Sequence, residues 1–274
     1  MSEPLLSVNA LRKSFGHGLT AVAGASFDIA EGTTMGVVGE SGSGKSTLAR
    51  LVLRLIEPDS GVVRFAGRDL LQTSKKDMRS VRASLQFVPQ HPATSLNPRA
   101  TVGSSIKFVM RAHGASRRTL NSRVDELLQD VGLAPEVSGR FPHQLSGGQL
   151  QRIAIARAVS TSPKLIVCDE PVSALDKSVQ AQVLNMLANL QAETGIALLF
   201  ITHDLAVAEH MADNVLVMNL GEIVERGDSQ GIWRNPQHPY TRQLLAAIPG
   251  RRALETAIPS IDPPTPVPAI VTER

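Results

Sequence analysis

The sequence predicts an α/β fold in which a mostly parallel sheet alternates with helices and one purely helical block is inserted. Two patterns lead to this prediction. Apolar runs of strand length alternate with amphipathic helical patterns along most of the chain, which is typical of parallel sheets. Between about residues 101 and 158, in contrast, apolar residues keep helical spacing and no strand pattern interrupts them.

The expected elements follow the chain in order. Strands are predicted at 6–8, 21–29, 34–38, 62–65, 85–88, 164–170, 196–202, 215–218 and 222–224. Helices outside the inserted block are predicted at 45–56 and 179–190. Pro92 and Pro98 make residues 91–99 irregular, and five prolines from Pro259 onward predict an extended tail.

Composition excludes several classes of protein. The net charge of +3 is small and dispersed, and an aromatic content of 3% argues against a base-stacking binder of single-stranded nucleic acid. The single cysteine, Cys168, lies in an apolar run, so we expect an inert core residue and no disulfide or cysteine-ligated metal. Neither a signal peptide nor a membrane-spanning run is evident, which predicts a soluble, intracellular protein.

Residues 39–47, Gly-Glu-Ser-Gly-Ser-Gly-Lys-Ser-Thr, match the phosphate-loop pattern G-x-x-x-x-G-K-[ST] between a predicted strand and a predicted helix. The glycines allow a tight turn whose N–H groups point at phosphate oxygens, and the helix dipole favours anions there. The expected nucleotide contacts are Gly39, Glu40, Ser41, Gly42, Ser43, Gly44, Lys45, Ser46 and Thr47. Lys45 adds charge at the phosphates, and the Ser46 hydroxyl can ligate Mg²⁺.

Two carboxylates, Asp169 and Glu170, end the strand predicted at 164–170. Phosphoryl transfer needs a metal ion near the phosphates and a group that orients the attacking water. We therefore expect Asp169 to hold Mg²⁺ and Glu170 to act as the general base. The alternative is a pair of carboxylates that merely cap a strand-to-helix turn.

The pentapeptide Leu-Ser-Gly-Gly-Gln at 145–149 opens an amphipathic helical pattern. Ser146 is a natural N-cap, and the two glycines expose backbone N–H groups at the helix start, which predicts a second anion site. One nucleotide does not need two such helix starts from one subunit. The pattern makes sense if each subunit lends one of them to a partner.

In their order and spacing, these motifs resemble those of the ATPase subunits of ABC transporters over nearly the whole chain. The resemblance implies a P-loop NTPase: a RecA-like core with an antiparallel β subdomain, plus a helical signature subdomain. It divides the chain into an ATP-binding α/β core (1–98 and 160–235), the helical subdomain (99–159) and a C-terminal extension with a Pro-rich tail (236–274). ATP and Mg²⁺ are the implied cofactors.

The resemblance also implies roles for single residues. Ser146, Gly147 and Gly148, followed by Gln149, would contact the γ-phosphate held by a partner subunit in a head-to-tail dimer. Gln90 would touch Mg²⁺ and the membrane partner, and His203 would steady the γ-phosphate and the attacking water. Asp176 would belong to the loop that crosses the dimer. Phe15, which by itself could be ordinary packing, matches the aromatic residue that stacks on adenine.

Segments 87–99 and 236–249 resemble those of importer ATPases for oligopeptides, dipeptides and nickel. This implies a second ATPase subunit, identical or a sister protein, two transmembrane permeases and an extracytoplasmic binding protein, at the cytoplasmic face of a prokaryotic membrane. No nucleic acid partner is expected. Three residues depart from the pattern: Pro89, His91 and Lys177. We expect His238 and Tyr240 to form a structural corner.

Four alternatives remain beside peptide import. One is an importer of nickel or another small solute, and a second is an ABC ATPase that acts on ribosomes or DNA. A kinase or GTPase would leave 145–149 unexplained, and the chain has no Asn-Lys-x-Asp guanine motif. A purely regulatory cassette is disfavoured by the presence of both Glu170 and His203.

Overall fold

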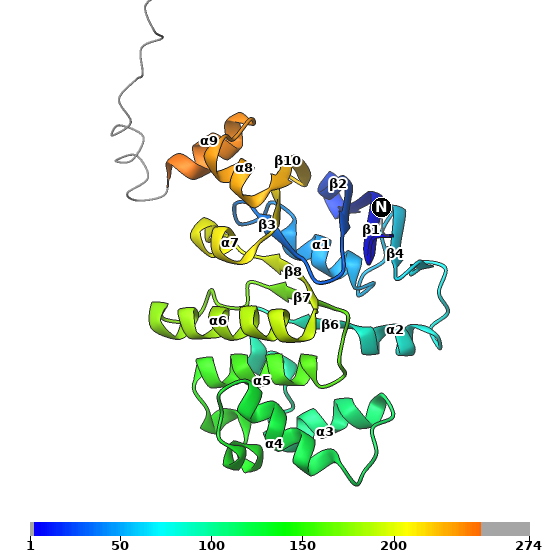
Figure 1. Ribbon diagram of the computed structural model, residues 1–274. Helices are drawn as coiled ribbons and strands as arrows, with labels where there is room; N and C mark the ends of the chain where they lie inside the picture. Colours follow the sequence, from blue (N-terminus) through cyan, green and yellow to red (C-terminus); the bar gives the residue numbers. More distant parts are fainter. Residues whose placement is uncertain (1–2, 248–274) are drawn as a thin grey trace, which may run out of the picture.

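A six-stranded sheet in the order β10-β9-β3-β8-β7-β6 lies at the centre of the molecule (Figure 1). The structure is a computed structural model that describes residues 3–247. The strands of this sheet are β3 (Thr34–Val38), β6 (Leu85–Val88), β7 (Leu165–Asp169), β8 (Ala197–Ile201), β9 (Asn214–Asn219) and β10 (Glu222–Asp228). All are parallel except β10, which pairs antiparallel with β9. The predicted parallel sheet is confirmed.

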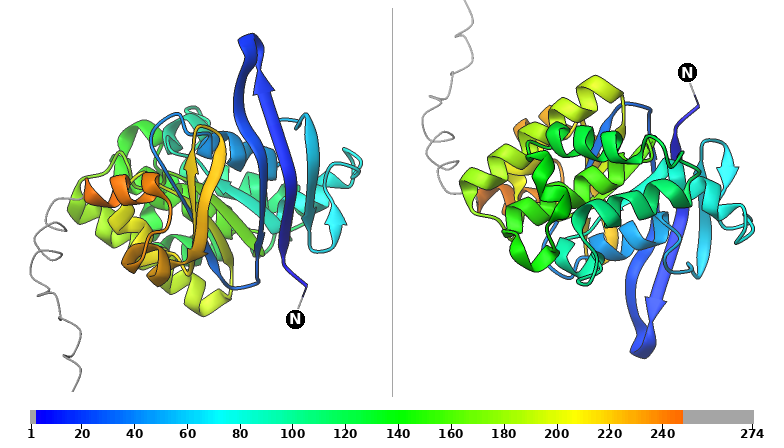
Figure 2. Two further views of the ribbon diagram at one scale, coloured as in Figure 1. Left: turned by 90° about the horizontal axis from the view of Figure 1, so that it is seen from above. Right: turned by 90° about the horizontal axis from the view of Figure 1, so that it is seen from below.

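A second sheet, antiparallel throughout, has the order β2-β1-β4-β5. Its strands are β1 (Leu6–Phe15), β2 (Leu19–Ile29), β4 (Ser60–Phe65) and β5 (Arg68–Asp69). Figure 2 shows the β1–β2 pair as a long ribbon that projects beyond the rest of the fold. The strand predicted at 6–8 was too short, because the polar stretch around Lys13 lacks apolar alternation yet pairs with β2.

Nine α-helices surround the sheets within residues 3–247. They are α1 (Lys45–Val52), α2 (Met78–Ser84), α3 (Val102–Ala112), α4 (Leu120–Asp130), α5 (Gly147–Val159), α6 (Lys177–Thr194), α7 (Leu205–Met211), α8 (Ser229–Arg234) and α9 (Pro239–Ala246). Short 3₁₀ turns stand at η1 (Gly16–Gly18), η2 (Pro92–Ser95), η3 (Pro135–Gly139) and η4 (Pro142–Gln144). The predicted helical block corresponds to α3, α4 and α5, at the opposite end of the molecule from α9 (Figure 1).

The helix predicted at 45–56 is wrong at its end. Helix α1 stops at Val52, and Arg54 takes a left-handed φ of 48°. The Leu55 N–H donates to the Arg50 carbonyl at 2.8 Å, a contact that ends the helix, and Leu55 is 52% exposed. The apolar spacing continued past the point where the backbone turns away, so periodicity alone placed the end too late.

The central sheet is covered on both faces. Along β7, Ile166 and Cys168 face one apolar cluster with the helical block, whereas Leu165 and Val167 face another with α1 and the antiparallel sheet. Burial on both faces explains why these strands are continuous apolar runs rather than alternating ones. Cys168 is fully buried in the first of these clusters, which confirms the expected core residue, and burial raises the pKa of its thiol to about 12.

A third apolar cluster holds the last described elements against the sheet. Trp233 of α8 and Leu245 of α9 pack with Val38, which directly precedes the phosphate loop. The predicted Pro-rich tail and the end of segment 236–249 lie outside the described residues. The division of the chain into 1–98 with 160–235, 99–159 and 236–274 stays a prediction.

Among residues 3–247, no helix combines the length and the apolar character that a bilayer crossing requires.

Phe200→Ala is expected to lower the free energy of unfolding by about 3–5 kcal/mol, because a fully buried phenyl ring in β8 would be replaced by a cavity. Phe108→Ala is the matched control, since this ring on α3 is 72% exposed, and its cost should stay below about 0.5 kcal/mol. Urea unfolding of both variants checks the difference; equal costs would contradict the described packing.

Candidate functional site

The phosphate loop has a backbone that only glycine can adopt at two positions. Gly39 has a φ of 150°, and a Cβ there would lie 2.1 Å from the Met218 carbonyl oxygen. Gly44 has a φ of 103°, and its Cβ would lie 2.1 Å from the Ala21 carbonyl oxygen. Both contacts are far below van der Waals separation, so the loop is held between β9 and β2 at a distance that excludes any side chain.

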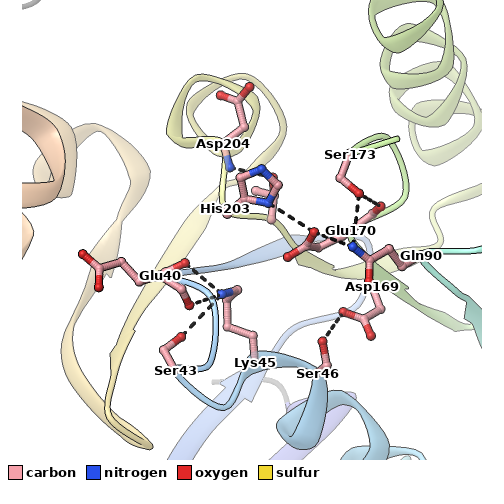
Figure 3. Close-up of polar contacts among 12 residues, drawn as sticks. Glu40, Ser43, Lys45, Ser46, Gln90, Asp169, Glu170, Ser173, His203 and Asp204 are labelled. Atoms are coloured by element: carbon pink, nitrogen blue, oxygen red, sulfur yellow. Dashed lines mark hydrogen bonds and ion pairs between the residues drawn. The ribbon is translucent and has the colours of Figure 1, made fainter. Parts of the chain in front are cut away.

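Lys45 is buried inside its own loop, with 4% of its surface exposed. Its Nζ donates to the carbonyl oxygens of Gly39 and Glu40 at 2.8 and 2.7 Å, and to Ser43 Oγ at 3.4 Å (Figure 3). Burial lowers the pKa of Lys45, while nearby carboxylates, led by Glu170, act in the opposite direction. The ammonium thus stands at the first turn of α1, where a phosphate anion would also be favoured.

Ser46, in the first turn of α1, contacts Asp169, the last residue of β7. Ser46 Oγ donates to Asp169 Oδ1 at 2.8 Å. Burial raises the pKa of Asp169, and the hydrogen bond from Ser46 acts against that rise. A hydroxyl and a carboxylate in contact at a phosphate loop are an oxygen donor set suited to a hard divalent cation.

Glu170 directly follows β7 in an unfavourable backbone conformation, with a φ of 47°. Its N–H donates to the Ile201 carbonyl at 3.0 Å, and its carbonyl accepts from Ser173 Oγ at 3.1 Å. A left-handed non-glycine residue costs about 1–2 kcal/mol, so these contacts maintain a strained position. In this conformation the carboxylate points toward the loop that carries Lys45 (Figure 3).

The Glu170 carboxylate is held from two sides. Gln90 Nε2 donates to Oε2 at 2.9 Å, and His203 Nδ1 lies 3.1 Å from the same oxygen. Gln90 follows β6 and His203 follows β8, so three neighbouring parallel strands deliver these side chains to one edge of the sheet. The structure brings together Gln90, Glu170 and His203 as the sequence predicted.

A cavity of about 870 Å³ lies over the phosphate loop. Residues of the predicted site line it: Gly39, Glu40, Ser41, Gly42, Gly44, Lys45, Ser46, Thr47, Gln90, Glu170 and His203. Phe15, the last residue of β1, also lines it and is 44% exposed. An exposed aromatic ring beside a phosphate loop is suited to stack on a base.

Ser146 begins α5 with a capping box. Its Oγ accepts from the Gln149 N–H at 3.3 Å, and its own N–H donates to Gln149 Oε1 at 3.0 Å. A Cβ on Gly148 would lie 2.5 Å from Val179 Cγ1, so the start of α5 packs closely on α6. The predicted N-cap is confirmed. None of Ser146, Gly147 and Gly148 lines the cavity over the phosphate loop of the same chain.

Asp176 caps α6, because its Oδ1 accepts from the Val179 N–H at 3.0 Å. The next residue, Lys177, is one of the departures from the family pattern, and its Nζ lies 3.0 Å from Asp204 Oδ2. This ion pair joins the loop before α6 to the residue after His203. The other two departures, Pro89 and His91, flank Gln90 without disturbing its bond to Glu170.

Comparison with known proteins identifies the family. A sequence model of the family described as "ABC transporter" matches residues 22–173. The chain belongs to the ABC transporter family. The resemblance inferred from the motifs is confirmed, and the protein is an ATPase that couples ATP hydrolysis to transport.

Among the relatives of this ABC ATPase are two bacterial proteins. The oligopeptide transport ATP-binding protein OppF of Salmonella typhimurium is 50% identical, over 84% of this chain and 70% of that protein. The putative oligopeptide transport ATP-binding protein YkfD of Bacillus subtilis is 48% identical, over 90% of this chain and 77% of that protein.

Solved structures agree on the fold. The ABC cassette CbiO1 of Clostridium perfringens, described as part of the transporter complex CbiONQ, is 27% identical with a TM-score of 0.78, over 93% of this chain and all of that one. MJ0796, described as a dimer bound to ADP and Pi, is also 27% identical with a TM-score of 0.75, over 82% of this chain and 98% of that one. The predicted P-loop NTPase fold is confirmed.

Several residues at the ATPase site belong to no sequence motif. Leu19, Leu220 and Leu244 line the cavity from β2, the β9–β10 turn and α9. The predicted corner at His238 and Tyr240 is present, since His238 Nδ1 accepts from the Tyr240 N–H at 3.2 Å, but the Tyr240 hydroxyl also reaches the phosphate loop. A single exposed leucine, or a tyrosine two hundred residues away, carries no signal in a motif.

Asp169→Asn is expected to raise the melting temperature of the nucleotide-free ATPase near neutral pH. Burial raises the folded-state pKa of Asp169 above its ordinary 3.8, so the folded chain binds that proton more tightly than the unfolded chain. Ionisation of Asp169 therefore costs stability above the folded pKa, and the advantage of the Asn variant should vanish as pH falls toward about 4. Thermal melting with a chelator from about pH 4 to 8 checks this.

The control is Asp28→Asn on β2, an exposed carboxylate. Its effect on the melting temperature should be small. A melting temperature for Asp169→Asn below that of the parent at every pH would contradict the assignment.

Proposed function

We propose that this ABC ATPase is the ATP-hydrolysing subunit of a prokaryotic peptide importer. Two observations support the proposal. Glu170 is held by Gln90 and His203 inside the cavity over Lys45, an arrangement suited to hydrolysis rather than to nucleotide binding alone. The relatives with 48–50% identity over most of the chain are named for oligopeptide transport.

Glu170 serves as the general base in this proposal. The contacts from Gln90 and His203 both fall on Oε2, so Oε1 is the oxygen assigned to the attacking water. The water oxygen forms a bond to the γ-phosphorus, the bond from that phosphorus to the β–γ bridging oxygen breaks, and Oε1 takes the proton. ADP leaves with the bridging oxygen.

Lys45 and His203 stabilise the charge on the phosphates. Lys45 is desolvated and anchored on its loop, so its charge acts in a low-dielectric site at little reorganisation cost. His203 is half exposed beside Glu170 and steadies the γ-phosphate and the water. Phe15 stacks on the base from the end of β1.

The residues present fit Mg²⁺ as a bound partner of the nucleotide. Ser46 and Asp169 already lie in contact, and Gln90 supplies a side-chain amide oxygen from beyond the end of β6, the strand that pairs with β7. Among residues 3–247 no cluster of three or more His, Cys, Asp and Glu forms a metal cage, which suits a cation held largely by phosphates. When bound, the cation would neutralise charge on the β- and γ-phosphates.

A second ATPase subunit, identical or a sister protein, completes each site. Ser146, Gly147 and Gly148 present a capped helix start away from their own phosphate loop, which suits contact with the γ-phosphate on a partner. MJ0796 is described as a dimer, and the present chain is proposed to pair head to tail with Asp176 in the crossing loop.

Two transmembrane permease subunits and an extracytoplasmic binding protein are the other proposed partners. Residues 90–99 connect Gln90, which contacts Glu170, to the start of the helical block. In this proposal they transmit the closure of the ATPase dimer to the permeases. The ATPase then lies peripherally at the cytoplasmic face of the membrane. Purification of the intact complex, followed by identification of its subunits and of the ligand on its binding protein, tests this; a bound metal ion in place of peptides would contradict peptide import.

Glu170→Gln is expected to lower ATP turnover by about 10²–10⁴-fold, because the amide cannot accept the proton from the attacking water. ATP binding should persist, and the variant should accumulate as an ATP-bound dimer in size-exclusion chromatography. The control is Glu193→Gln near the end of α6, an exposed side chain that should leave turnover unchanged. Normal turnover in Glu170→Gln would remove this residue from the base role.

Ser146→Arg is expected to reduce hydrolysis by at least about 10²-fold, because the long side chain blocks the partner's γ-phosphate and removes donors from the closed site. Binding of ATP to the isolated subunit should stay within about threefold of the parent, as Ser146 does not line its own cavity. Ser122→Arg on the exposed face of α4 controls for added bulk and charge. If titration calorimetry finds ATP binding lost together with hydrolysis, the signature does not act on a partner.

A further inference from the structure

Helix α9 reaches the phosphate loop although it lies far from it in sequence. The Glu40 N–H donates to the Tyr240 hydroxyl at 3.1 Å, across a separation of 200 residues. Leu244, one turn further along α9, lines the cavity over the same loop. None of the roles described above for the nucleotide site uses this helix.

The contact falls on the peptide group that also holds Lys45. The Glu40 N–H belongs to the peptide formed with Gly39, and the carbonyl oxygen of that peptide accepts from Lys45 Nζ at 2.8 Å. One rigid, planar unit is therefore held at its carbonyl end by Lys45 and at its N–H end by Tyr240. Loss of the hydrogen bond at the N–H end would therefore allow the Gly39 carbonyl, which accepts from Lys45, to reorient.

The orientation of this peptide needs an external restraint. Gly39 precedes it, and glycine imposes little torsional preference of its own. The Met218 carbonyl excludes a side chain at Gly39, so no residue with a narrower torsional preference can replace this glycine and fix the peptide. A hydrogen bond from outside the loop supplies the restraint that the local sequence lacks.

Tyr240 is itself well supported. The Glu225 carboxylate accepts from the N–H groups of Gln237 and His238 at 2.6 and 3.0 Å, and the His238 side chain caps α9. The Tyr240 ring packs with the apolar cluster that includes Trp233. Burial raises the pKa of Tyr240, so its hydroxyl stays neutral through the physiological range.

We propose that Tyr240 is a positioning residue for Lys45, acting through the Gly39–Glu40 peptide, and that α9 is thus a wall of the nucleotide site. By holding the peptide, the hydroxyl keeps the carbonyl acceptor in place and the Lys45 ammonium in its phosphate-binding position. The loop is therefore already ordered before the nucleotide binds. Because binding then loses less conformational entropy, the phosphates bind more tightly.

Tyr240→Phe tests the proposal in the full-length chain, because it removes the hydroxyl and retains the ring. The dissociation constants of ATP with Mg²⁺ and of inorganic tripolyphosphate are measured by calorimetry, together with the melting temperature of the ligand-free protein. Both dissociation constants are expected to rise about three- to tenfold, as for loss of one net hydrogen bond, with the melting temperature nearly unchanged. Gln243→Ala, on an exposed part of α9, should change none of them.

A double-mutant cycle with Lys45→Met tests whether the effect passes through Lys45. In that background, Tyr240→Phe should no longer alter the ATP dissociation constant. Three results would overturn the proposal: unchanged dissociation constants in Tyr240→Phe, an effect on ATP but not on tripolyphosphate, or an equal effect with and without Lys45. A lower melting temperature with unchanged binding would assign Tyr240 a purely structural role.

Discussion

The burial of one positive charge organises the nucleotide site. Lys45 lies almost fully out of solvent, and an ammonium in that position is costly unless acceptors surround it. The carbonyls of Gly39 and Glu40 supply the contacts, and the carboxylates of Glu170 and Asp169 supply opposing charge. The loop can wrap the ammonium this closely only because Gly39 and Gly44 leave no side chain against their neighbours.

The parallel sheet brings the remaining groups to that charge. Strands β3, β6, β7 and β8 end at one edge, and each is followed by a residue of the site. Gln90, Glu170 and His203 then form one contact set, with the strained backbone of Glu170 held by hydrogen bonds to the neighbouring segments. Apolar clusters on both faces keep the strands in register, so the positions of these groups follow from the packing of the core.

Much of this arrangement could be predicted from short segments. The pattern at 39–47 specified its own loop, Ser146 specified its own cap, and the apolar runs specified buried strands. Predictions that depended on longer-range packing were less accurate. Helix α1 ended before the apolar spacing did, and β1 continues far past the strand predicted at 6–8 because a polar stretch pairs with β2. The short helices α2, α7, α8 and α9 gave too little periodicity to be predicted.

The sequence by itself determined the family and the chemistry, because phosphate loops, helix caps and strand-end carboxylates are formed by neighbouring residues and carry their geometry with them. Tertiary structure alone decided which distant groups support that chemistry. The contact of Tyr240 with Glu40, the ion pair of Lys177 with Asp204 and the apolar cavity wall join residues from separate elements. Such contacts depend on how the helices pack against the sheet, and no local sequence pattern encodes the positions of elements that are far apart in the chain.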